Sequence, residues 1–146
     1  MKGLYILLSV CAGIVLPFQG TINGRLGNSL QSPVYASFIS FLVGTVGLLA
    51  YGIVIHGPIK IQALKQAPLY ELTGGILGAF YVLVVILMLP RLGAALTFSL
   101  VVAGQMFVSL AFDHTGFLVA TQHPINIWRV LGLALIIGGV ILVRKF

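Results

Sequence analysis

Acidic side chains are almost absent from this sequence, which has only Glu71 and Asp113 in 146 residues. Charged residues of both signs together make up 7% of the chain, whereas soluble domains have about 25%. Hydrophobic residues make up 60%. A chain with so little charge cannot cover a water-exposed surface, so the composition predicts an integral membrane protein whose main partner is the lipid bilayer.

Cysteine occurs once, at Cys11, and this excludes an intrachain disulfide framework. The histidines His56, His114 and His123 lie far apart without the spacing of metal ligands, so no metal site is expected. Glycine-rich phosphate-binding motifs and nucleophile elbows are missing too. The eight basic residues are scattered singly and form no patch for nucleic acid. We therefore expect neither an enzyme nor a protein with a bound cofactor.

Five apolar runs are long enough to cross a bilayer, which takes about 20 residues. They cover approximately residues 3–23, 34–55, 72–90, 93–112 and 128–143. The connections between them are short and leave no room for a soluble domain. The first run is too long for the apolar region of a signal peptide, and we expect it to be retained. The pattern predicts an all-α fold with one transmembrane domain over residues 1–146, and Pro17 predicts a bend in its first helix.

Basic residues are divided equally between the two sides of the membrane if the chain crosses it five times. The N-terminal side receives Lys2, Lys60, Lys65 and Arg129, and the other side receives Arg25, Arg91, Arg144 and Lys145. Orientation follows an excess of Lys and Arg in cytoplasmic loops, and neither side has one. Together with the odd number of spans, this predicts a dual-topology, antiparallel homodimer of ten helices. The alternative is that the equal division is accidental.

A few polar side chains lie within the apolar runs, where they are expected to face the helix bundle or a wet cavity. Gln19 and Asn23 are four residues apart and share one helix face, and so do Gln105 and Ser109. We predict that these residues and nearby hydroxyl and aromatic groups bind a substrate, in the set Gln19, Asn23, Gln105, Ser99, Ser109, Tyr81 and Phe107. The alternative role is interhelical hydrogen bonding, which contributes about 0.6 kcal/mol on average.

Charged residues near the ends of the runs are candidates for gating or coupling. Arg25 is expected to mark the mouth of the site by pairing with an acid or attracting an anionic group. Asp113 is followed by His114, and a carboxylate beside an imidazole can relay protons near neutral pH. Glu71 is the other acid. The alternative is that these are solvated residues at helix ends.

Several blocks, in this order and spacing, resemble the YdcZ-like small bacterial membrane proteins, a half-size branch of the drug/metabolite transporter superfamily. The blocks are QGTINGRLG at 19–27, SFLVGT at 40–45, GGILGAFYV at 74–82, PRLGAALTFSLVVAGQM at 90–106 and DHTG at 113–116. The resemblance implies a five-helix unit in the bacterial inner membrane, a dimer equivalent to the ten-helix superfamily fold, and export or exchange of a small molecule. The four-helix multidrug-resistance relatives have a Glu in their first helix, whereas this chain has Gln19 and Asn23, which does not favour proton antiport through a shared carboxylate.

The leading functional hypothesis is transport of a small polar or drug-like solute by an antiparallel homodimer that exports or exchanges it by alternating access. We expect the cavity to lie between the first four spans of both chains, with the fifth span at the periphery. Its amides suit polar solutes, and its aromatic rings could also contact cations. Two alternatives stay open: a passive channel for small anions, and a membrane assembly subunit that transports nothing.

Overall fold

The computed structural model describes residues 2–59 and 61–146, and within these ranges the chain is helical apart from short connections. Lys60, one of the basic residues in the topology count, lies outside the described residues. Four helices, α1, α2, α4 and α5, are long and apolar enough to cross a membrane. In chain order the elements are α1 (Lys2–Ser29), α2 (Pro33–His56), α3 (Ile61–Gln66), the 3₁₀ helix η1 (Leu69–Thr73), α4 (Gly74–Thr115) and α5 (Ile127–Lys145).

The helix α4 is too long for one membrane crossing. Its 42 residues rise about 63 Å, roughly twice the thickness of the hydrocarbon core. Its helical path is interrupted at Gly93, where φ is 75° and ψ is 165°, a backbone conformation that only glycine adopts readily. The interruption divides α4 into a first arm, residues 74–92, and a second arm, residues 94–115. With α1, α2 and α5, the two arms match the five predicted spans in number and approximate position.

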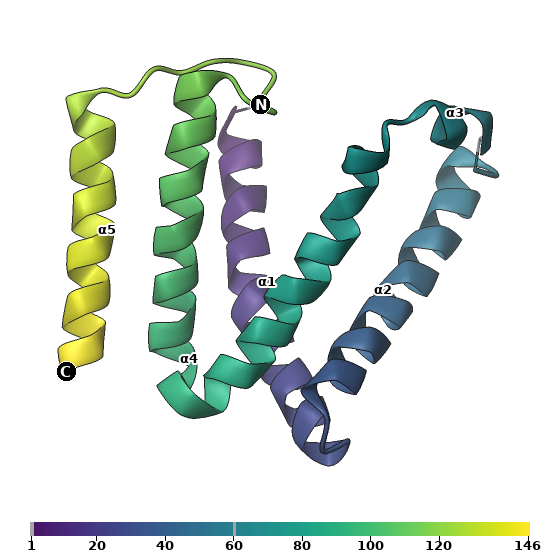
Figure 1. The fold of residues 1–146 in the computed structure, drawn as a ribbon, viewed down its shortest axis with the longest axis horizontal. Coiled ribbons are helices and arrows are strands. Elements are labelled where there is room, and N and C mark those ends of the chain that lie inside the picture. The colour runs from purple at the N-terminus through teal and green to yellow at the C-terminus, as the bar shows by residue number, and fades with distance from the viewer. Residues whose placement is uncertain (1, 60) are drawn as a thin grey trace. The chain divides into compact units, whose positions relative to one another are not determined.

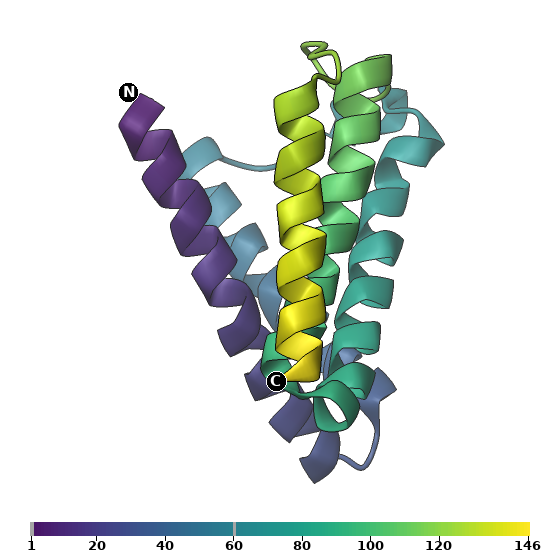
Figure 2. The same cartoon turned by 90° about the vertical axis from the view of Figure 1, so that its left-hand side faces the viewer.

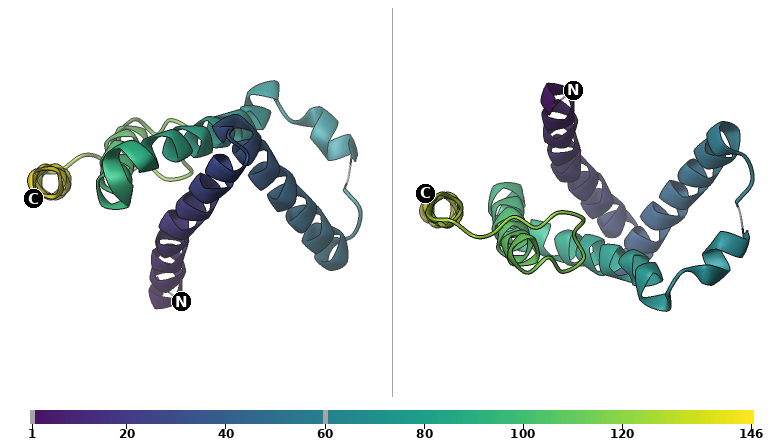
Figure 3. Two further views of the ribbon diagram at one scale, coloured as in Figure 1. Left: turned by 90° about the horizontal axis from the view of Figure 1, so that it is seen from below. Right: turned by 90° about the horizontal axis from the view of Figure 1, so that it is seen from above.

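The helices belong to two compact units. The N-terminal unit, Met1–Arg91, holds α1, α2, α3, η1 and the first arm of α4, and the C-terminal unit, Leu92–Phe146, holds the second arm and α5. Within the N-terminal unit, α1, α2 and the first arm come together near the turn between α1 and α2 and diverge away from it (Figures 1 and 3). Within the C-terminal unit, the second arm and α5 lie side by side (Figures 1 and 2).

The helix α1 continues six residues beyond the end predicted for the first span. It contains Pro17 and runs to Ser29, and it changes direction about midway along its length, as predicted (Figures 1 and 3). Residues 19–27 are therefore helical and do not form a helix exit. Because the helix is continuous there, Gln19 and Asn23 do lie on the same face.

Burial in the N-terminal unit is concentrated in the second half of α1 and in the helices around it. The small core consists of Ala36, Val82 and Ile86, with Leu26, Phe41 and Tyr81 packed against it. Gly20, Asn23 and Gly27 are the buried residues of α1, whereas residues 3–15 of the same helix are exposed. Exposed apolar residues are what a membrane helix presents to lipid or to another helix.

The turn between α1 and α2 is short and well defined. The hydroxyl oxygen of Ser32 accepts a hydrogen bond from the backbone N–H of Tyr35 at 3.3 Å, and Pro33 opens α2, a position where proline costs no helical hydrogen bond. Gln31 has a positive φ of 50°. This turn fixes how α2 starts beside the end of α1.

Candidate functional site

Asn23 and Tyr81 hold buried polar atoms that have no hydrogen-bond partner within the described part of the chain. Asn23 is 5% exposed, and its Nδ2 and the Oη of Tyr81 are both enclosed without a partner. Most buried polar groups in native proteins are paired, and leaving one unpaired costs about 1–3 kcal/mol. Two such groups, one from α1 and one from the first arm of α4, mark a candidate site.

Both residues line one small cavity between α1 and the first arm, which we call the inner cavity. It is formed by Leu16, Gln19, Gly20 and Asn23 from α1 and by Tyr81, Val82 and Val85 from α4. Its volume is about 10 Å³, roughly the room needed for a single water molecule. Three of the residues predicted to bind substrate, Gln19, Asn23 and Tyr81, are thus brought together, although Tyr81 is 58 residues from Asn23 in the sequence.

A second cavity, the outer cavity, lies between the end of α1, the start of α2 and the end of the first arm. It has a volume of about 560 Å³ and is lined by Gly27, Asn28, Gln31, Pro33, Ile86, Leu87, Pro90 and Arg91. The Nη1 of Arg91 donates a hydrogen bond to the carbonyl oxygen of Leu87. The sequence-based prediction did not include Asn28, Gln31 or Arg91. Helical spacing does not point to Gln31, because α1 ends at Ser29 and Gln31 lies in the turn that follows.

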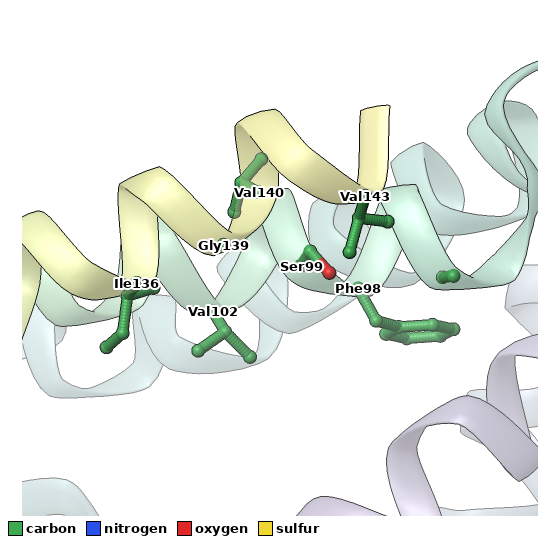
Figure 4. A pocket seen from close by; sticks show the side chains of 8 residues that line it. Phe98, Ser99, Val102, Ile136, Gly139, Val140 and Val143 are labelled. Carbon is green, nitrogen blue, oxygen red and sulfur yellow. The ribbon is translucent and has the colours of Figure 1, made fainter. Parts of the chain in front are cut away.

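The predicted residues of the C-terminal unit do not converge on one point. Ser99 lines a groove of about 410 Å³ between the second arm and α5, beside Phe98 and Val140 (Figure 4). Ser109 lines a separate groove of about 250 Å³ on the same two helices, together with Asp113, so these two predicted residues are brought together. Gln105 and Phe107 are exposed on the surface of their unit.

Asp113 forms an ion pair with Arg129, and their Oδ2 and Nη1 atoms are 3.0 Å apart. The same Nη1 donates to the carbonyl oxygen of His123 at 3.1 Å, and the backbone N–H of His123 donates to the carbonyl oxygen of Asp113 at 2.8 Å. His114 accepts a hydrogen bond at Nδ1 from the N–H of Ile125, at 3.3 Å. These contacts hold the loop of residues 116–126 against the end of α4.

The other two charged candidates are exposed. Arg25 lies on the surface of α1, and Glu71 lies in η1, where one carboxylate oxygen is 3.5 Å from the hydroxyl of Tyr70. In residues 2–59 and 61–146, no three His, Cys, Asp or Glu side chains are grouped closely enough to hold a metal ion.

The chain was compared with protein families, curated proteins and solved structures. It matches the family described as "Putative inner membrane exporter, YdcZ" over residues 4–142. No curated protein and no solved structure matched. Because the family match covers nearly the whole chain, and because four of its helices can cross a membrane, the protein belongs to the YdcZ family and is a multi-pass inner membrane transporter and not an enzyme.

Proposed function

We propose that this protein exports a small polar solute and that the solute binds at the inner cavity. The observation that supports this is the pair of buried, unpaired groups on Asn23 and Tyr81. The Nδ2 of an asparagine donates hydrogen bonds, and a tyrosine hydroxyl can do so. One acceptor atom of a solute would satisfy both groups and offset the cost of burying them.

The solute must move α1 and the first arm apart to reach these groups, because the inner cavity holds about 10 Å³. A site that is closed without a solute and opens to admit one suits alternating access, in which helices rock around a binding site near the middle of the membrane. The glycines Gly20 and Gly27 are buried at this contact. They let the two helices approach closely in the closed conformation without large side chains interlocking.

An antiparallel homodimer is the assembly we propose for this transporter. Three features support it: the equal division of basic residues between the two sides, the odd number of spans, and the many large apolar side chains exposed on α1 and α2. Two copies related by a twofold axis in the membrane plane would form the inverted repeat on which many transporters are built. Residues of the second copy would then complete the cavity.

A flux assay in liposomes tests this function. Purified protein is reconstituted, and uptake of a panel of labelled polar solutes is measured with and without solute and proton gradients. Uphill, saturable exchange is the expected result. Downhill, unsaturable flux would indicate a channel, and the absence of flux would leave the assembly-subunit hypothesis.

Variants then test the site. Asn23→Ala and Tyr81→Phe are expected to lower flux strongly without lowering the yield of folded protein. Tyr51→Phe is the matched control, because Tyr51 is a membrane-span tyrosine that is 63% exposed. If Asn23→Ala and Tyr81→Phe both transport at the unmodified rate, the inner cavity is not the binding site.

A further inference from the structure

We infer that the outer cavity is an entry subsite for small organic anions, with a carboxylate as the recognised group. This rests on the proposed function, because it places the outer cavity on the route of the solute to the inner cavity. The inference is based on the geometry of the α1–α4 contact, on the distribution of charge in the N-terminal unit, and on the donors that line both cavities.

The two cavities lie one after the other along the same pair of helices. The inner cavity is lined by Gln19 and Asn23 of α1. The outer cavity is lined by Gly27, one turn farther along α1, and by Gln31 in the turn that follows this helix. Ile86 of the first arm lines the outer cavity and follows Val85, which lines the inner one. A Cβ atom at Gly27 would lie 3.1 Å from the Cγ2 of Ile86. The contact of Gly27 with Ile86 therefore separates the outer cavity from the inner one, and a solute passing between them must displace it.

The outer cavity has a cation in its lining and no acid of the N-terminal unit near it. Arg91 lines it, and Arg25 lies on α1 less than one turn before Asn28. The only acid of this unit is Glu71, which lies beyond the other end of the first arm. The helix rises about 26 Å between Gly74 and Arg91, more than twice the distance over which exposed charges act at physiological ionic strength. No acid of the N-terminal unit therefore lies near enough to offset the charge of Arg91 for an arriving anion.

The polar groups of the outer cavity suit a carboxylate. A guanidinium has five N–H donors in a planar fork that matches two carboxylate oxygens, and the one contact of Arg91, to Leu87, uses a single nitrogen. The amides of Asn28 and Gln31 add neutral donors on the facing segment. The inner cavity also presents donors, from Asn23 and Tyr81. Both cavities therefore offer hydrogen-bond donors to the same kind of solute atom, an acceptor oxygen.

Binding of three benzene derivatives that differ in charge tests this inference. Benzoate, benzamide and benzylammonium are titrated into the purified full-length protein, and binding is measured by isothermal titration calorimetry. We expect benzoate to bind more tightly than benzamide and benzylammonium to bind most weakly. The matched variants are Arg91→Gln, which removes the cation of the outer cavity, and Arg144→Gln, which removes a cation of α5 that the sequence predicts to lie on the same membrane side.

Arg91→Gln is expected to weaken benzoate binding about tenfold or more, the loss typical of a hydrogen bond to a charged group, and to leave benzamide binding within about twofold. Arg144→Gln should leave both unchanged. The inference is overturned if benzoate does not bind, if benzylammonium binds as tightly as benzoate, or if Arg91→Gln leaves benzoate binding unchanged. In each of these cases the proposed function would stand if flux of some other solute still depended on Asn23 and Tyr81, so the two failures can be told apart.

Discussion

Tyr81 is a residue for which stability and transport are expected to respond in opposite directions. Because the Oη of Tyr81 is buried without a partner, removing it in Tyr81→Phe should raise the free energy of unfolding by about 1 kcal/mol, while flux falls. The measurement is the melting temperature of the purified protein beside its flux in liposomes. Tyr51→Phe should change neither. A clear fall in melting temperature for Tyr81→Phe would mean that the hydroxyl contributes to the fold, and would contradict a binding role.

Gly24 and Gly27 lie in the same helix, but they differ in how much space an added side chain would have. A Cβ at Gly27 would lie 3.1 Å from Ile86 Cγ2, whereas a Cβ at Gly24 would lie at an ordinary 3.6 Å from Leu89 Cδ1. Alanine in place of either glycine gains about 1 kcal/mol of helix propensity, so the difference between the two variants reports the contact. We expect Gly27→Ala to be about 1–3 kcal/mol less stable than Gly24→Ala.

Gly27→Ala should also transport more slowly, because it tightens the contact between the two cavities. Melting temperature and liposome flux of the two variants, measured side by side, check both expectations. Equal flux in Gly24→Ala and Gly27→Ala would show that the Gly27–Ile86 contact does not limit the passage of the solute.

At the scale of structural elements, the loop of residues 116–126 depends on the ion pair of Asp113 with Arg129. The two side chains are 31% and 32% exposed, and such a pair contributes about 0.2–1 kcal/mol. Arg129→Gln removes it together with the contact to His123. We expect hydrogen exchange of the loop amides, among them those of His123 and Ile125, to become about two- to fivefold faster.

The control for this prediction is Glu71→Gln, which removes the other acid of the chain from an exposed position in η1. It should leave exchange in residues 116–126 unchanged. If Arg129→Gln leaves the loop equally protected but abolishes proton-dependent flux, Asp113 and Arg129 act in coupling, as the sequence suggested for Asp113, and not in holding the loop.

At the scale of the whole molecule, the equal division of basic residues predicts that copies insert in both orientations. Reporter fusions at the C-terminus should give signals on both sides of the inner membrane. Lysines added after Phe146 should fix one orientation and abolish transport, and lysines added before Gly3 should fix the other. Co-expression of the two lysine-bearing chains should restore transport, because it supplies both halves of an antiparallel pair. One fixed orientation of the unmodified chain would contradict the antiparallel dimer.

Much of the fold could be predicted because membrane helices are specified locally. Hydrophobic length and composition alone located the membrane spans, and the predicted second span, 34–55, agrees with α2 (Pro33–His56). The predicted first span ended at residue 23 because the apolar run gives way there to glycines and polar residues. The helix nevertheless continues to Ser29, and in this part of it Gly24 and Gly27 lie against Leu89 and Ile86 of the first arm.

The sequence by itself determined the membrane class, the approximate spans and the family, and its four-residue spacing placed Gln19 and Asn23 on one helix face. Only the tertiary structure decided which distant groups meet: Asn23 lies with Tyr81 at one cavity, Asp113 pairs with Arg129, and Gln105 is left exposed on its unit. The physical reason is that helix formation and membrane insertion follow from residues within a few turns of one another. Contacts between helices depend on which side chains are small enough to let two backbones approach, and residues distant in the sequence make those contacts.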